Sequence, residues 1–197
     1  MILIIGRTGS GKDYLARELA KSGLKQVLSY TTRPPRTPDE NTHIFISPEE
    51  TGNYKDKIAT TVINGYEYFA TKQQMTDNDV YIIDPNGTYE LLENCPDVTF
   101  IICYLHADND QRRDRAVGRG ADTQKEAAVF DKRDASEDPQ FSAFEKMLST
   151  DEEYQAFLKK YPNTVVFNKR NDYKARTMET LASGLAALNA NSCFLLN

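Results

Sequence analysis

The opening segment of the chain constrains the fold more than any other stretch. Residues Ile2 to Ile5 form a continuous apolar run without polar alternation, which predicts a strand that is buried on both faces. A glycine-rich turn follows directly, and from Lys12 the pattern is helical as far as Ser22, where Gly23 supplies a typical helix end. This order of strand, turn and helix predicts an α/β fold in which helices flank a central parallel sheet.

The turn matches the pattern G-x-x-x-x-G-K, known as the P-loop. Glycine has no Cβ and tolerates positive φ, so the backbone N–H groups can approach a phosphate at the start of the helix, where the helix dipole favours negative charge. The lysine side chain then reaches the β- and γ-phosphates. A chance match is the alternative, but the buried strand before the turn and the helix after it argue against chance. The predicted ATP-binding residues here are Gly6, Thr8, Gly9, Ser10, Gly11, Lys12 and Asp13.

Asp13 stands where this pattern normally has serine or threonine. The usual hydroxyl group binds Mg²⁺ without adding charge, whereas a carboxylate is a harder ligand that lies near phosphate oxygens of its own sign. We therefore expect Asp13 to hold the Mg²⁺ that accompanies ATP, directly or through a water molecule.

Length and composition limit the possible functions. With 197 residues, 40% of them hydrophobic, the chain can form one core and one domain. The formal net charge of −5 argues against nucleic acid as a partner, because binding to phosphate backbones needs a basic surface. Cys95, Cys103 and Cys193 lack metal-ligand spacing and are typical of reduced cytoplasmic thiols. No apolar run suits a membrane span or a signal peptide, so we expect a cytoplasmic protein, monomeric or homodimeric.

A second informative segment carries two arginines in a stiff loop. Residues 31–38 contain three prolines, which exclude a helix and fix the directions of Arg33 and Arg36. Two guanidinium groups three residues apart can bind one phosphate, and Ser29 can add a hydroxyl donor. The alternative is a solvated loop whose arginines have no ligand.

The segment Ser29-Tyr30-Thr31-Thr32-Arg33-Pro34-Pro35-Arg36 resembles the S-x-T-T-R-x-x-R segment of guanylate kinases, and the P-loop is similar as well. The resemblance runs with gaps from residue 1 to about residue 172. It implies a P-loop kinase that transfers a phosphoryl group from ATP to GMP or dGMP. In that family the serine and the two arginines hold the phosphate of the acceptor nucleotide, which implies that role for Ser29, Arg33 and Arg36.

The same resemblance implies further acceptor-binding residues. His43 stands where the family has a tyrosine that touches the acceptor phosphate. A histidine can donate to phosphate, more strongly once it is protonated near neutral pH, or it is simply a partly exposed strand residue. Tyr68 matches a phosphate-binding tyrosine, and Thr71 lies beside the position of a small hydroxyl residue near the base. Asp84 matches an aspartate near the acceptor nucleotide, and its alternative role is to cap the helix that begins at Pro85.

Two positions depart from the family pattern. The glutamate that recognises guanine is expected where this chain has Ala59. A methyl group accepts no hydrogen bond, and each buried donor left unpaired costs about 1–3 kcal/mol. Ile82 replaces an aspartate of the family, and we hypothesise that Asp13 supplies the missing carboxylate near Mg²⁺. These departures keep open an acceptor with another base.

A later segment resembles the lid of guanylate kinases. Arg115-Ala116-Val117-Gly118-Arg119-Gly120 is similar to the family motif R-x-x-G-R-G, and Arg133 resembles a third lid arginine. The resemblance implies that Arg115, Arg119 and Arg133 close over ATP and neutralise charge on the transferred phosphoryl group. Helical spacing also puts Arg112 on this face, and the alternative is a solvated face with local ion pairs. In the last predicted strand, Asn168 matches a family residue close to adenine.

The sequence also predicts how the single domain is divided. We expect a core of residues 1–31, 76–111 and 135–189, an acceptor-binding subdomain of residues 32–75, a lid of residues 112–134 and a loose tail of residues 190–197. Two other functions stay open. One is a kinase of the same fold for another nucleoside monophosphate, and the other is a guanylate-kinase-like module that binds proteins without catalysis.

Overall fold

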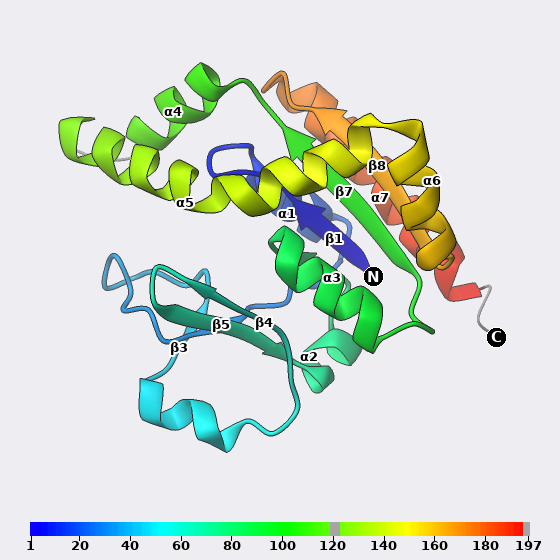
Figure 1. Cartoon of the computed structure of the whole chain (residues 1–197), viewed down its shortest axis with the longest axis horizontal. Helices are drawn as coiled ribbons and strands as arrows, with labels where there is room; N and C mark the ends of the chain where they lie inside the picture. The colour runs from blue at the N-terminus through cyan, green and yellow to red at the C-terminus, as the bar shows by residue number, and fades with distance from the viewer. Residues whose placement is uncertain (119–122, 195–197) are drawn as a thin grey trace.

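A computed structural model of the protein describes residues 1–118 and 123–194 (Figure 1). Its central sheet has four parallel strands in the order β6-β1-β7-β8. These strands span Val80–Ile82 (β6), Ile2–Ile5 (β1), Phe100–His106 (β7) and Thr164–Arg170 (β8). All four residues of β1 are fully buried, which explains the apolar run at the start of the chain and confirms the predicted fold class.

Helices cover both faces of this sheet, and alternate residues of β1 point to opposite faces (Figure 1). Ile2 and Ile4 pack against α1 (Lys12–Lys21) and α7 (Ala175–Phe194), whereas Leu3 and Ile5 pack in the core with α3 (Pro85–Asn94), α5 (Thr123–Ser149) and α6 (Asp151–Lys160). The second half of α5 belongs to this core. Its buried residues Phe141, Phe144 and Met147 confirm the predicted packing surface.

A second sheet lies apart from the first and holds the arginine-bearing loop. Its strand order is β3-β2-β5-β4, with β2 at Tyr30–Thr31, β3 at Ile44–Phe45, β4 at Lys57–Ile63 and β5 at Tyr66–Thr71. The β4–β5 turn has φ of 53° at Asn64 and 82° at Gly65, as a type I′ turn requires. The remaining elements are η1 (Pro48–Asn53), α2 (Lys72–Asp77) and α4 (Asn109–Val117).

Between α1 and β2, Gln26 makes a single bridge to Val80, and β2 begins only at Tyr30. The structure corrects one expected element. The loose tail predicted from residue 190 is wrong as far as Phe194, where α7 ends. No glycine or proline follows Gly184, and Asn189 is buried, so nothing stops the helix at 190.

α5 contains a proline, Pro139, which separates its first half from the half that packs in the core. None of the helices in the described ranges combines the length and the hydropathy that crossing a bilayer needs.

Candidate active site

The P-loop runs from the end of β1 to the start of α1, and its backbone depends on two glycines. Gly9 has φ of 82° and Gly11 has φ of 99°. A Cβ atom at Gly9 would lie 2.5 Å from the carbonyl oxygen of Arg112, so α4 also excludes any larger residue there. Gly11 is the N-cap of α1 and offers no side chain to its first N–H groups, which remain directed at the turn.

Lys12 and Asp13 stand at the start of α1. The ammonium group of Lys12 donates to the carbonyl oxygens of Gly6 at 2.5 Å and Arg7 at 3.1 Å, so it folds over the turn. Asp13 is exposed in the first turn of the helix. Mg²⁺ bound to a nucleotide takes its ligands mainly from phosphates and water, with one or two carboxylates from the protein. No cluster of three acidic, histidine or cysteine ligands occurs within residues 1–118 and 123–191. A single carboxylate such as Asp13 is compatible with this sparse donor set.

Residues beyond β8 hold the turn from one side. The side chain of Asn171 is buried, donates to the carbonyl oxygen of Ser10 at 2.7 Å and accepts from the N–H of Tyr173 at 2.8 Å. The hydroxyl of Tyr173 donates to Gly9 at 2.9 Å, and the guanidinium of Arg115 stacks 3.2 Å above the Tyr173 ring. The sequence analysis missed Asn171 and Tyr173. The sequence feature that could have indicated them is the polar pair Asn171-Asp172, which lies between the last strand and the closing helix.

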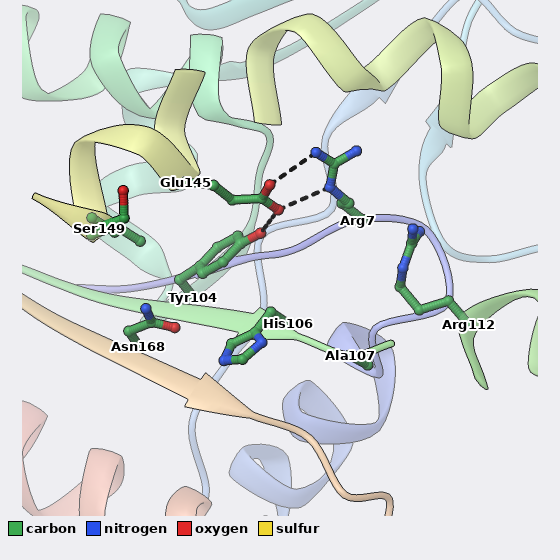
Figure 2. Close-up of a pocket in the computed structure, with 9 residues that line it drawn as sticks. Arg7, Tyr104, His106, Ala107, Arg112, Glu145, Ser149 and Asn168 are labelled. Carbon is green, nitrogen blue, oxygen red and sulfur yellow. Dashed lines mark hydrogen bonds and ion pairs between the residues drawn. The ribbon is translucent and has the colours of Figure 1, made fainter. Parts of the chain in front are cut away.

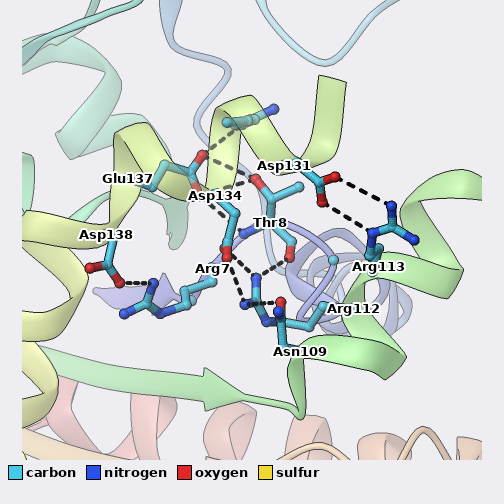
Figure 3. A network of polar contacts seen from close by, with 12 residues as sticks. Arg7, Thr8, Asn109, Arg112, Arg113, Asp131, Asp134, Glu137 and Asp138 are labelled. Atoms are coloured by element: carbon cyan, nitrogen blue, oxygen red, sulfur yellow. Dashed lines mark hydrogen bonds and ion pairs between the residues drawn. The ribbon is translucent and has the colours of Figure 1, made fainter. Parts of the chain in front are cut away.

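Helices α4 and α5 hold the turn from the other side through ion pairs (Figure 3). Arg7 donates to Glu145 at 2.9 Å and to Asp138 at 2.7 Å, and these carboxylates raise its pKa. Arg112 is buried and donates to Asp134 at 2.7 Å and to the carbonyl oxygen of Thr8 at 3.1 Å. Arg112 therefore supports the P-loop, and the alternative of a solvated arginine face does not hold at this position.

One carboxylate of α5 reaches the P-loop backbone itself. Glu137, only 5% exposed, accepts from the N–H of Thr8 at 3.2 Å and from the Thr8 hydroxyl at 3.0 Å. The same carboxylate accepts from Nε of Arg133 at 2.6 Å. The predicted lid arginine Arg133 and the predicted ATP-binding residue Thr8 therefore share one anion, and Figure 3 shows Glu137 beside Thr8.

A cavity of about 390 Å³ lies beside the P-loop, between α5 and the ends of β7 and β8 (Figure 2). Asn168 lines it together with Tyr104 and His106, whose rings stack with centroids 6.2 Å apart. The Tyr104 hydroxyl donates to Glu145, and burial together with that carboxylate raises the pKa of Tyr104. Asn168 thus faces this cavity, three residues before the asparagine that contacts the P-loop.

The acceptor loop of residues 31–38 places its two arginines differently. Arg33 is buried and donates to both oxygens of Glu40, at 2.8 and 3.2 Å, while its guanidinium stacks 5.2 Å from the Phe45 ring centroid. This pairing with Arg33 lowers the pKa of Glu40 to about 2. Arg36 exposes 61% of its side chain. Desolvation and the charges of Arg133 and Arg33 lower the pKa of Arg36.

His43 is part of a small polar group beside Arg33. Its Nδ1 lies 3.0 Å from the hydroxyl of Ser29, and its ring meets the ring of Tyr68 edge-on at 5.5 Å. Burial and the neighbouring charge of Arg33 lower the pKa of His43 to about 4. The imidazole is therefore neutral at pH 7, and the prediction that it protonates near neutral pH is wrong.

The structure gives capping roles to two predicted base-site residues. Thr71 caps α2, where its hydroxyl accepts from the N–H of Gln74 at 3.2 Å. Asp84 caps α3 by accepting from the N–H of Gly87 at 3.1 Å, which is the alternative that the sequence left open. Burial raises the pKa of Asp84. Ala59 is buried with φ of 55° at an irregularity of the β4–β5 pairing.

The predicted residues therefore form two groups. The P-loop residues gather at the end of β1, and Ser29, Arg33, His43 and Tyr68 lie together at the second sheet. Arg133 contacts the first group through its bond to Glu137. Arg119 lies outside the residues that the structure describes.

Comparison with solved structures finds proteins similar to this chain in fold. A guanylate kinase from Anaplasma phagocytophilum is similar in structure with a TM-score of 0.50 and 16% sequence identity, over 97% of this chain and 85% of that chain. An uncharacterized protein from Eubacterium ventriosum ATCC 27560 has a TM-score of 0.42 at 14% identity, over 96% of this chain and 98% of that one. A search among curated protein sequences finds no match.

A family model described as an AAA domain matches residues 2–140, which include the P-loop, the acceptor loop and the first half of α5. This match covers more than half of the chain. The protein therefore belongs to the AAA domain family of P-loop proteins, and its α/β fold is the fold of the guanylate kinases.

Proposed function

We propose that this protein is a nucleoside monophosphate kinase that transfers the γ-phosphoryl group of ATP to GMP or dGMP. The observation that supports the proposal is the P-loop at the end of β1, in a chain with the guanylate kinase fold. Its residue Thr8 shares the Glu137 carboxylate with Arg133, so a proposed lid arginine lies at the proposed donor site.

In the proposed reaction the protein positions two nucleotides and neutralises charge, and no covalent intermediate is needed. Lys12 and the P-loop N–H groups hold the donor phosphates, while Arg33, Arg36 and Tyr68 orient the acceptor phosphate. The lid arginines Arg115, Arg119 and Arg133 stabilise the negative charge that spreads over the transferred group. Mg²⁺, held through Asp13 and the phosphates, would add charge neutralisation. Residues 32–75 would act as the acceptor-binding subdomain and residues 112–134 as the lid, which excludes water on closing.

A coupled assay of ADP release tests the proposal directly. The protein is supplied with ATP, Mg²⁺ and one acceptor at a time from a panel of ribo- and deoxynucleoside monophosphates, and the Lys12→Ala variant is the control. We expect ADP release that depends on GMP or dGMP and disappears in the variant. Activity that is equal in the variant, or absent with every acceptor, contradicts a kinase and favours a binding module.

A kinase with a different base preference is the second candidate, and Ala59 favours it. The resemblance to guanylate kinases implies a guanine-binding glutamate at this position, whereas the residue here is a buried alanine in the left-handed backbone region. Lengthening this side chain would strain both the backbone and the packing. The acceptor panel separates the two candidates, because a preference for a base other than guanine supports the second.

A further inference from the structure

Glu137 is a carboxylate that is held against the proposed donor site. Its side chain is 94% buried, and both oxygens accept hydrogen bonds. The donors are the N–H and hydroxyl of Thr8 and the guanidinium of Arg133. A buried carboxylate needs such donors to offset the cost of leaving water, so this arrangement is a specific one.

The partners of Glu137 distinguish it from the other acids of α5. Asp131 pairs with the exposed Arg113, Asp134 pairs with Arg112, and Asp138 pairs with Arg7. None of those three arginines is a group that the proposed reaction uses on phosphate. Glu137 alone among these four acids bonds to a predicted ATP-binding residue and to a predicted catalytic arginine.

A carboxylate and a phosphate oxygen need the same kind of hydrogen-bond donors at this position beside Thr8 and Arg133. Both accept charge-assisted hydrogen bonds from backbone N–H and guanidinium groups. The two anions cannot bind the same donors at the same time, because they repel each other in a site of low dielectric constant. While Arg133 donates to Glu137, this nitrogen does not donate to a transferred phosphoryl group.

We infer that Glu137 is an internal competitor for the phosphate site: its carboxylate occupies the donors of Thr8 and Arg133 and must leave them before the donor triphosphate is fully bound. This inference rests on the proposed function and adds a regulation to it. ATP binding would release the Arg133 side chain from Glu137 and so make it available for the reaction. The arginine would thus be withheld until the donor nucleotide is in place.

Competition of this kind lowers apparent affinity in proportion to the fraction of molecules in which the site is open. Glu137→Gln keeps the size of the side chain and removes its charge, which weakens its hold on Arg133. We expect this variant to bind ATP about tenfold more tightly than the unmodified protein, measured by isothermal titration calorimetry. Asp131→Asn is the matched control, because it removes one charge from the same helix at an exposed ion pair. Its affinity should equal that of the unmodified protein.

An equal or weaker affinity in Glu137→Gln overturns the competition, while measurable ATP binding by the unmodified protein leaves the proposed function standing. If neither protein binds ATP, both the proposed function and this inference fail. A crystal structure of the unmodified protein with a non-hydrolysable ATP analogue gives a second test that needs no variant. We expect the Glu137 carboxylate to have left the Thr8 N–H and Arg133 to face the triphosphate. A triphosphate in the P-loop with the Glu137–Thr8 bond intact overturns the inference alone.

Discussion

The P-loop and the acceptor loop both present positive groups for a phosphate, but they are held in opposite ways. The P-loop is fixed by partners more than 100 residues away, namely Arg112, Glu137, Asn171 and Tyr173. The acceptor loop is held by residues that are nearer in the sequence, because Arg33 pairs with Glu40, seven residues later, and Thr32 exchanges hydrogen bonds with Glu67. The first site is thus held by distant elements of the fold, and the second by an ion pair and by contacts within its own sheet.

This difference explains why the two sites differ in how far they match the guanylate kinase pattern. A residue substituted into the P-loop must fit against partners that are distant in the sequence. At Gly9, for example, any Cβ atom would collide with the carbonyl oxygen of Arg112, so few residues can be accommodated. In the acceptor site, His43 and Ala59 replace residues of other size and charge while the second sheet keeps its pairing. The structure therefore restricts the proposed ATP site more strongly than the proposed acceptor site. The preference for the acceptor nucleotide is the part of the proposal that most needs a test.

The largest expected effect is at Lys12. Lys12→Ala should lower kcat in the ADP-release assay by about 1000-fold, because it removes the charge that stabilises the β- and γ-phosphates. The fold should be unaffected, and Lys25→Ala, at an exposed lysine outside both sites, should keep full activity. If Lys12→Ala retained more than a tenth of the activity, the P-loop would not be the donor site.

Arg33→Ala should separate the acceptor site from the donor site. We expect KM for the acceptor nucleotide to rise about 100-fold, since a buried guanidinium that can bind phosphate with two hydrogen bonds is lost. KM for ATP should change less than about twofold. Initial rates at varied acceptor and varied ATP measure both constants, with Arg17→Ala on the exposed surface of α1 as the control. A parallel rise in both constants would show that the sites are not independent.

Asn171 tests the long-range support of the P-loop. Asn171→Ala leaves the Ser10 carbonyl and the Tyr173 N–H without their partner, so we expect a loss of about 2 kcal/mol in the free energy of unfolding. Asn168→Ala, which removes the same amide from the cavity beside β8, should cost less than about 0.5 kcal/mol. Urea unfolding measures both values, and equal losses would argue against a special role for Asn171.

His43 gives the smallest effect near pH 7, because its contribution to stability changes only in acid. Its folded pKa of about 4 lies below the ordinary value of 6.5, so the folded protein binds fewer protons than the unfolded chain between these values. The stability that this adds is complete above pH 6.5 and is lost as the pH falls towards 4, by roughly 1 kcal/mol per pH unit. Urea unfolding at several pH values should show a shallower decline for His43→Gln. The same decline in both proteins would exclude the histidine as the cause.

The sequence predicts the core elements well because their signals are local. An apolar strand, a glycine turn and an Asn-Gly hairpin each appear within a few residues, and β1, α1 and the β4–β5 turn form as predicted. The α5 contacts have no such signal. Its acids look like a solvated helix face, and only the fold brings Glu137 to Thr8 and Asp138 to Arg7.

The candidate site was predictable where one residue has one evident role. The glycines and lysine of the P-loop are of this kind. Thr71 and Asp84 show the limit, since a hydroxyl or carboxylate that suits a nucleotide suits a helix cap equally, and burial decides between these roles. Asn171 escaped prediction because its partner, the carbonyl oxygen of Ser10, is 161 residues away.

Pro139 divides α5 into two segments that can bend relative to each other. A proline has no N–H, so the helix lacks the hydrogen bond that residue 139 would make to the carbonyl group of residue 135, and bending at this point breaks one bond fewer than elsewhere. The joint lies between the acidic half, with Glu137, and the half whose Phe141 and Phe144 are locked in the core. The first half of α5, which holds Glu137, can therefore bend at this point with the smallest loss of hydrogen bonding, while the packed half stays in the core.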